Sequence, residues 1–348
     1  MRIHVLELNI GDKLASDTYN HSGLHLLSAG TIVDAGDITT LARHQVDYVD
    51  IVPRQAERVE EDETFHYQIT SEQTHSFHAA NQAIKALFQS AALNESISSE
   101  VVESAFNDVM QNFKDEKDIV SLLLCLNNQD EYTYQHSVQV GMLSYYLATW
   151  LGKPEKEARI IGKAGYLHDI GKSKVDPEIL KKPGKLTADE FSEVQKHTIY
   201  GYEIIRKSLK DDTLALVALQ HHERMDGSGY PLKKTETQIH SYASIVAVAD
   251  IYSAMISDRI YQEKRDLLYV LKELHRMSFG QLDPKLTQVF IRNMIPNFIG
   301  KKVLLSDGRK GLIVMTNPSD FFNPLIKINE NFVDLSMLKG VEITSIIM

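Results

Sequence analysis

A carboxylate in the middle of the most apolar helical stretch is the feature that most restricts how this chain can fold. Asp250 lies within residues 241–256, a segment rich in alanine, isoleucine and valine whose composition predicts a buried helix. Burying an ionised carboxylate there costs on the order of several kcal/mol unless it is paired or bound to a cation. The fold therefore has to bring a cation, or a cationic side chain, to Asp250.

A set of nitrogen and oxygen ligands lies in the same helical region. Five histidines and a second aspartate stand at predicted helix ends or on predicted helix faces: His136, His168, Asp169, His197, His221 and His222. Any one of these histidines could be a hydrogen-bonded core residue. Together with Asp250, and without a cysteine among them, they suit a carboxylate-bridged pair of iron, manganese or zinc ions and not a thiolate zinc site.

Such a centre would carry phosphoester chemistry. Asp169 can bridge two cations through its two oxygens, and the cations would lower the pKa of a shared water so that hydroxide exists near neutral pH. That hydroxide would attack phosphorus in line. Lys172 follows Asp169 by three residues and could contact the same phosphate or assist the leaving oxygen, although taken alone it would be interpreted as a surface lysine.

The residue composition and the spacing of apolar residues change along the chain. Residues 1–54 hold short β-prone runs punctuated by glycines, with a helix expected over 38–44, and an acidic, apolar-poor linker follows over 55–69. From about residue 70 to 295 the apolar spacing is helical. Residues 298–348 are β-rich and offer no catalytic constellation.

Local signals refine this division. Thr187–Glu190 is a capping box, and we expect the helix that it starts to carry Phe191, Val194 and His197 on one apolar face. In the C-terminal segment, Asp307-Gly308 predicts a hairpin turn. Three strands are expected there, over 302–305, 311–315 and 325–328.

Composition excludes several classes of protein. The net charge is 37 − 47 = −10, which argues against binding to nucleic acid polymers or to anionic lipid. The densest apolar run, 122–126, is far too short for a membrane span. Cys125 is the only cysteine, so no intrachain disulfide can form, and residues 1–7 do not resemble a secretion signal. We expect a cytoplasmic protein.

Two motifs resemble a known family. His168-Asp169-Ile170-Gly171-Lys172 is similar to the signature of the HD-superfamily phosphohydrolases, and residues 221–231, which end in Gly229-Tyr230-Pro231, resemble the defining loop of the HD-GYP subfamily. The extended loop, in this order after the first motif, is very specific. The resemblance covers about residues 115–295, roughly half of the chain.

Combined with the patterns at the two ends, this resemblance implies a mainly α protein. An all-helical HD-type domain would carry a small N-terminal mixed α/β unit and a small C-terminal β-rich appendix. The expected division is a strand-rich domain over 1–54, an acidic linker over 55–69, a helical connector over 70–114, an HD-GYP phosphodiesterase domain over 115–297 and a β-rich segment over 298–348.

The resemblance also implies an activity, namely hydrolysis of the bacterial second messenger cyclic di-GMP to pGpG or GMP. Its metal ligands would be the seven residues named above, holding two divalent ions, with iron or manganese ahead of zinc, nickel or magnesium. Asp169 and Lys172 would be catalytic, and Lys172, Arg259, Gly229 and Tyr230 would bind the substrate. Gly229 and Tyr230 would shape the substrate loop, which in the family is implicated in contacts with GGDEF-type proteins. A homodimer is left open.

Three positions depart from the family pattern. Tyr132 stands where some members have an additional metal-binding Glu, so we expect two metal ions and not three. Ser253 replaces an Asp that many members have, and Gln262 replaces an Arg. We expect Ser253 and Gln262 to affect the fit to guanine and phosphate. Two alternatives therefore stay open: a phosphodiesterase for another cyclic dinucleotide such as cyclic GMP-AMP, and a weakly active effector that binds nucleotide or partner proteins.

Overall fold

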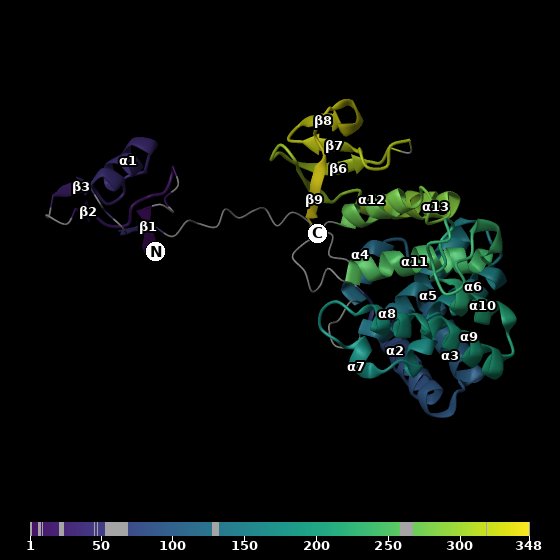
Figure 1. The fold of residues 1–348 in the computed structure, drawn as a ribbon. Coiled ribbons are helices and arrows are strands. Elements are labelled where there is room, and N and C mark those ends of the chain that lie inside the picture. The colour runs from purple at the N-terminus through teal and green to yellow at the C-terminus, as the bar shows by residue number, and fades with distance from the viewer. Residues whose placement is uncertain are drawn as a thin grey trace. The chain divides into compact units, whose positions relative to one another are not determined.

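The computed structural model describes residues 2–5, 8, 10–20, 24–44, 46, 48–52, 69–126, 132–257, 267–317 and 319–347. The chain divides into two compact units, residues 1–66 and 67–348, and each is described by itself (Figure 1).

The first unit is a small mixed α/β structure. Strand β1 (Arg2–His4) pairs antiparallel with β4 (Tyr48–Asp50), and β2 (Thr18–Tyr19) pairs antiparallel with β3 (His25–Leu27). Helix α1 spans Ala35–Arg43. Its small core includes Leu14, Leu41 and Ile51, all at most 1% exposed. The expected mixed unit and its helix are confirmed.

The second unit is predominantly helical. Its helices are α2 (Ser71–Asn94), α3 (Ser99–Phe113), α4 (Ile119–Leu126), α5 (Tyr132–Trp150), α6 (Glu155–Leu167), α7 (Pro177–Leu180), α8 (Ala188–Gln195), α9 (His197–Leu209), α10 (Asp212–Gln220), α11 (Ser241–Ser257), α12 (Leu267–Met277) and α13 (Pro284–Met294). Short 3-10 helices occur at η3 (Ile170–Lys174), η4 (Glu236–Gln238) and η6 (Ile295–Phe298). Within the described ranges, no helix combines the length and apolarity that crossing a membrane requires.

Helix α5 is the centre of this unit. Residues 135–148 are all buried, because α5 packs against α6 on one side and α11 on another (Figure 1). A helix that is apolar all round is expected at such a central position. The buried helix predicted over 241–256 is confirmed as α11. The contact between α5 and α11 brings polar residues of two central helices together inside the core.

One helix prediction is wrong in its detail. The capping box at Thr187 is present: its hydroxyl accepts from the Glu190 amide at 3.2 Å, and the Glu190 carboxylate accepts from the Thr187 amide at 2.7 Å. However, this helix ends at Gln195, and Phe191 is 49% exposed. A 3-10-type bond from the Lys196 amide tightens the last turn, and His197 begins α9 instead of continuing the face of α8.

A five-stranded antiparallel sheet forms the C-terminal part of the second unit. Its strands are β5 (Lys302–Leu305), β6 (Lys310–Met315), β7 (Leu325–Ile328), β8 (Asn331–Asp334) and β9 (Ile343–Ile347), in the order β8-β7-β6-β5-β9. The hairpin predicted between β5 and β6 is confirmed, with Gly308 at φ +85°. The apolar residues Val303 and Ile313 belong to the same continuous core as the helices. The mainly α fold with strands at both ends is therefore confirmed.

Candidate metal centre

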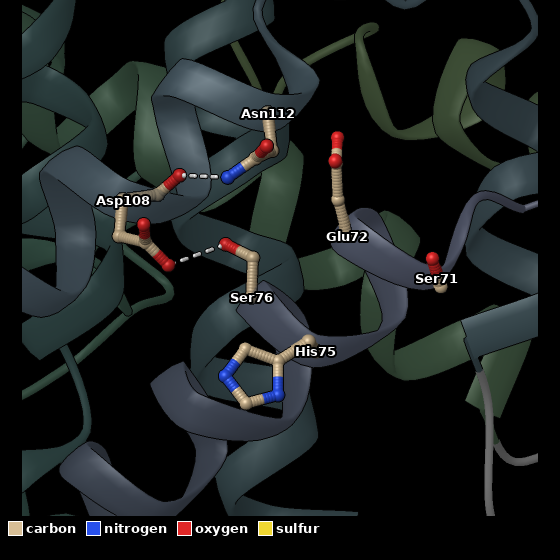
Figure 2. Close-up of a pocket in the computed structure, with 6 residues that line it drawn as sticks. All are labelled: Ser71, Glu72, His75, Ser76, Asp108 and Asn112. Carbon is tan, nitrogen blue, oxygen red and sulfur yellow. Dashed lines mark hydrogen bonds between the residues drawn. The ribbon is translucent and has the colours of Figure 1, made fainter.

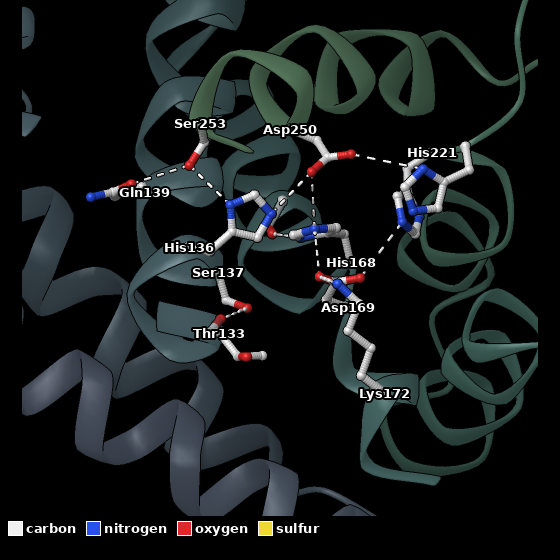
Figure 3. Close-up of polar contacts among 12 residues, drawn as sticks. Thr133, His136, Ser137, Gln139, His168, Asp169, Lys172, His221, Asp250 and Ser253 are labelled. Carbon is white, nitrogen blue, oxygen red and sulfur yellow. Dashed lines mark hydrogen bonds and ion pairs between the residues drawn. The ribbon is translucent and has the colours of Figure 1, made fainter. Parts of the chain in front are cut away.

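The structure brings the seven predicted ligands together, although they come from five segments (Figure 3). His136 lies in α5 and Asp250 in α11, the two central helices. His168 and Asp169 directly follow α6, His197 begins α9, and His221 and His222 directly follow α10. Six of the seven residues are at most 7% exposed, and His222 is half-buried.

The ligand atoms form two groups, each within 4.8 Å of one another. The first cluster contains Asp169, His197, His221 and His222, and the second cluster contains His136, His168 and Asp250. Among the residues that the structure describes, these are the groups of three or more such atoms close enough to share an ion.

Asp169 faces both clusters. Its Oδ1 lies 3.3 Å from His197 Nε2 and 3.8 Å from His221 Nε2. Its Oδ2 lies 3.3 Å from His168 Nε2, in the second cluster. A carboxylate that presents one oxygen to each of two imidazole groups has the arrangement that a bridging ligand requires.

Asp250 also spans the two clusters. Its Oδ1 lies 3.0 Å from His136 Nε2 and 3.8 Å from His168 Nε2, and its Oδ2 lies 3.8 Å from His222 Nδ1. The groups nearest to its carboxylate are therefore imidazoles from α5, the end of α6 and the end of α10.

Carbonyls in the last turn of a helix orient three of the imidazoles. Nδ1 of His168 lies 2.6 Å from the Gly165 carbonyl, Nδ1 of His197 lies 2.6 Å from that of Val194, and Nδ1 of His221 lies 2.9 Å from that of Ala218. The last carbonyls of a helix have no intrahelical donor. Because a carbonyl oxygen can only accept, each Nδ1 carries the proton, and each Nε2 directs its lone pair toward the centre.

The polar atoms of the centre fit a cation. His168 Nε2 and Asp169 Oδ1 are buried and have no hydrogen-bond partner in the described part of the chain. Buried polar atoms are rarely left in this state, and a place for a bound cation is one of the few physical reasons for it. Imidazole nitrogens and carboxylate oxygens are also the donor set of iron, manganese and zinc.

The electrostatics favour ionised carboxylates and, at three of the ligands, neutral imidazoles. Burial lowers the pKa of His168, but the Asp169 carboxylate raises it by more. Burial lowers the pKa of His197 to about 4, and burial together with neighbouring imidazoles holds the pKa of His221 and of His222 well below the usual range. Burial would raise the pKa of Asp169 and of Asp250, but the adjacent cationic groups outweigh it and hold both well below the usual range. These are the protonation states that metal ligation requires.

Two residues of the first motif have different positions from the ligands. Lys172 is partly exposed, and its Nζ lies 2.5 Å from Asp169 Oδ2. Burial lowers the pKa of Lys172, but the Asp169 carboxylate raises it by more, so the ammonium stays charged. Gly171 is buried against α9: a Cβ there would lie 1.9 Å from the His197 carbonyl oxygen and 2.4 Å from the Gly201 amide. Only glycine allows this contact between η3 and α9.

The loop after α10 folds back over the centre. The ring of Tyr230 lies 4.6 Å from the ring of His222, centroid to centroid. Gly229 is buried, and a Cβ there would lie 2.4 Å from the His222 carbonyl oxygen. The predicted role of Gly229 in shaping the loop therefore has a steric basis, because no larger residue allows this backbone approach.

Sequence reasoning missed two residues that hold this loop. Glu223 is 2% exposed, and its carboxylate accepts from the amides of Leu232 at 2.7 Å and Lys234 at 2.8 Å. Arg224 donates to the carbonyls of His221 and Glu223. Both directly follow the histidine doublet, and an acid next to two imidazoles at a helix end was the signal available in the sequence.

Ser253 does not lie where its expected role requires. We expected it to affect the fit to guanine and phosphate, but it is completely buried, and its hydroxyl lies 3.0 Å from His136 Nδ1 and 3.1 Å from Gln139 Oε1 (Figure 3). It therefore supports a ligand instead of facing a nucleotide. Arg259 and Gln262 lie outside the described residues.

A groove elsewhere in the second unit offers a contrast (Figure 2). It measures about 420 Å³ and is lined by Ser71, Glu72, His75, Ser76, Asp108 and Asn112 of α2 and α3. Its polar groups bond to one another: Ser76 donates to the Asp108 carboxylate at 2.8 Å, and Asn112 donates to the Asp108 carbonyl at 2.9 Å. The groove shares no residue with the two clusters.

Comparison with known proteins agrees with the motifs. The model of the HD domain family matches residues 120–286. A cyclic di-GMP phosphodiesterase of Pseudomonas aeruginosa is 32% identical over 250 residues, which are 72% of this chain and 60% of that protein. A 3′3′-cGAMP-specific phosphodiesterase of Vibrio cholerae is 32% identical over 182 residues, which are 51% of this chain and 42% of that protein.

This chain thus spans 60% of the first relative's length and less than half of the second's. Among solved structures, an HDG"Y"P protein from Bdellovibrio bacteriovorus shares the fold, with a TM-score of 0.51 at 17% identity over 83% of this chain and 97% of that one. The resemblance expected from the sequence is confirmed, because residues 120–286 of this chain match the model of the HD domain family.

Proposed function

We propose that residues 115–297 form a metal-dependent phosphodiesterase domain that hydrolyses cyclic di-GMP. The observation that carries this proposal is the position of Asp169, which presents one oxygen to each of two imidazole clusters. The Pseudomonas aeruginosa relative, named a cyclic di-GMP phosphodiesterase, supports this choice of substrate.

The seven residues of the two clusters would hold two divalent cations, with iron or manganese favoured by the carboxylate-rich, thiol-free donor set. Bound there, the cations would supply a water of lowered pKa as nucleophile and would screen the phosphate charge. Asp169 and Asp250 each contact both clusters and would fix the distance between them. The imidazoles that bond to backbone carbonyls would keep their orientation before the substrate binds.

In the proposed reaction, the oxygen of water bonds to phosphorus and the bond from phosphorus to the ribose 3′ oxygen breaks. The proton ends on the leaving 3′ oxygen. One cleavage opens cyclic di-GMP to linear pGpG, and a second gives two GMP. Lys172, charged and partly exposed beside Asp169, would contact the scissile phosphate and offset the negative charge that develops there.

Further contacts of the substrate belong to the same proposal. Arg259 would contact phosphate or base, and Tyr230, packed on His222, would line one side of the site. The outer surface of the Gly229–Pro231 loop would be the contact for a GGDEF-type partner protein.

A second substrate has a specific observation in its favour. The Vibrio cholerae relative is as similar in identity as the first one, and its name specifies 3′3′-cGAMP. The two dinucleotides differ in one purine base, so the metal centre would serve both, and residues that contact the base would decide between them.

Product analysis tests the proposal. Wild type, Asp169→Asn and the exposed control Asp189→Asn would be loaded anaerobically with Fe(II) or Mn(II) and incubated with cyclic di-GMP or 3′3′-cGAMP. We expect linear products from wild type and control, and none from Asp169→Asn. A faster reaction with 3′3′-cGAMP would select the second substrate. Binding of either dinucleotide without any product from metal-loaded wild type would reject the enzyme and indicate a binding effector.

A further inference from the structure

His136 differs from three other imidazoles of the centre in how it is oriented. His168, His197 and His221 each use a backbone carbonyl in the last turn of a helix. His136 lies within α5, where each carbonyl of the preceding turn accepts an amide of the helix itself. The carbonyl of Thr133 also accepts the hydroxyl of Ser137 at 3.2 Å (Figure 3). The orientation of His136 therefore has to come from a side chain.

That side chain is Ser253 of α11. His136 Nδ1 lies 3.0 Å from Ser253 Oγ, and Ser253 Oγ donates to Gln139 Oε1 at 3.1 Å (Figure 3). Ser253 follows Asp250 by three residues, and Gln139 follows His136 by three, so each supporting residue shares a helix face with the ligand before it. Ser253 and Gln139 are both completely buried, which keeps bulk water from replacing either contact.

A hydroxyl has one proton, so the direction of this chain of bonds matters. When Ser253 donates to Gln139 Oε1, it must accept from His136 Nδ1–H, and Nε2 then directs a lone pair toward the second cluster. In the opposite direction Ser253 donates to Nδ1, and Nε2 carries the proton. That proton would point at Asp250 Oδ1, 3.0 Å away, giving a stable pair that cannot bind a metal through His136.

We propose that Ser253 and Gln139 are positioning residues: Gln139, as the acceptor at the end of the chain, fixes the His136 tautomer and so sets the affinity of the second cluster for its cation. The inference rests on the proposed metal centre and goes beyond it by placing control of one ion in two residues that touch neither ion nor substrate. Outer partners of metal-bound imidazoles typically change metal affinity by about 10–100-fold.

Two substitutions of similar length separate this role from simple packing. Gln139→Glu keeps an acceptor toward Ser253, whereas Gln139→Met removes it. If Gln139 fixes the direction of the hydrogen bonds, Gln139→Glu retains the metal affinity of the second cluster and Gln139→Met loses it. A packing role predicts the reverse order, because a buried carboxylate costs more than a buried thioether.

The measurement is titration of metal-free full-length protein with Mn(II), followed by calorimetry. We expect two ions for wild type and for Gln139→Glu, and for Gln139→Met and Ser253→Ala one ion of unchanged affinity and one weakened by about 10–100-fold. Equal affinities in wild type, Gln139→Met and Ser253→Ala would overturn the inference while leaving the centre intact. Wild type that binds no Mn(II) would instead reject the proposed centre.

Nitrogen spectra of the imidazoles in metal-free protein give a second readout that does not depend on how Gln139→Glu folds. We expect His136 to carry a proton at Nδ1 in wild type and to be protonated at Nε2 alone, toward Asp250 Oδ1, in Gln139→Met. The tautomers of His168, His197 and His221 should not change, because backbone carbonyls hold them. A wild-type His136 protonated at Nε2 alone would overturn the inference.

Discussion

The centre contains two kinds of imidazole, and they differ in what holds them. His168, His197 and His221 are backbone-oriented ligands, each bonded to a carbonyl three residues earlier at a helix end. His136 is a side-chain-oriented ligand in the second turn of α5, held by Ser253. A backbone-oriented ligand is placed as soon as its helix ends correctly, so its geometry can be lost only with the local fold. A side-chain-oriented ligand can be altered by one substitution that leaves the fold intact.

The largest expected effect comes from separating the backbone segments that carry the backbone-oriented ligands. In Gly171→Ala, the new Cβ would meet the His197 carbonyl oxygen at 1.9 Å and the Gly201 amide at 2.4 Å. These are backbone atoms that cannot rotate away, so η3 and α9 must separate. We expect the free energy of unfolding to fall by about 3 kcal/mol or more, measured by urea denaturation, with metal binding lost at both clusters.

Gly201→Ala, across the same contact, is the matched control. Its new Cβ would lie 3.3 Å from the Ala218 side chain and no closer to any other atom. Because alanine also favours the helix interior by roughly 0.5–1 kcal/mol over glycine, we expect a change within about 1 kcal/mol. Equal losses for the two variants would show that the tight approach at Gly171 does not hold the backbone-oriented ligands.

Removing one ligand from each cluster tests whether the clusters bind separate ions. His221→Ala should remove the ion of the first cluster, and His136→Ala that of the second, each leaving the other. Loss of a ligand should lower the affinity for the ion of that cluster by at least about 10–100-fold, the range found when only an outer partner of a ligand is lost. Metal content per chain after Mn(II) loading and desalting measures this. Simultaneous loss of both ions in either variant would contradict two separable clusters.

Acid should act on the metal-free centre through its buried imidazoles. The pKa of His197 is about 4 in the fold, against about 6.5 in an unfolded chain. Between these values the unfolded chain binds a proton that folded His197 does not, so stability falls as pH drops from 6.5 toward 4. His221 and His222 shift in the same direction, while the raised pKa of His168 opposes them.

Urea denaturation of metal-free protein at pH 7 and pH 5 measures this effect, and we expect a loss of roughly 1–2 kcal/mol at pH 5. The measurement thereby compares His197, His221 and His222, whose pKa values are lowered, with His168, whose pKa is raised. Stability that is unchanged or higher at pH 5 would mean that His168 dominates and would contradict the expected sign.

Local sequence signals were sufficient for the ligands and for most helices. His168-Asp169 and His221-His222 each follow a segment of helical spacing, and a helix end is where side chains meet free carbonyls. Asp250 was identified because a charge in an apolar helix needs a partner. In the C-terminal sheet, β5, β6 and β7 were predicted from short apolar runs, while β8 and β9 were missed because their pattern of burial depends on the strands beside them.

The sequence could not show the tertiary contacts that position the ligands. The apolar spacing continues across Lys196, so nothing marked the break that places His197 at the start of α9. Ser253 was expected to affect the fit to guanine and phosphate, and only the packing of α11 on α5 shows that its hydroxyl reaches His136. The proposed contact of Arg259 stays a prediction.

The smallest expected effect concerns His222, a ligand that the loop holds by packing against Tyr230. In Glu223→Gln one carboxylate oxygen becomes an amide that cannot accept, so the amide of Leu232 or Lys234 loses its partner. This should cost about 1–3 kcal/mol locally. Amide hydrogen exchange at residues 232 and 234 should accelerate, with exposed Glu236→Gln as control. The second cluster should keep its Mn(II) affinity, since Ser253 and the Gly165 carbonyl orient His136 and His168. Unchanged exchange would show that the carboxylate does not anchor the loop, and His222 would then depend on Tyr230 alone.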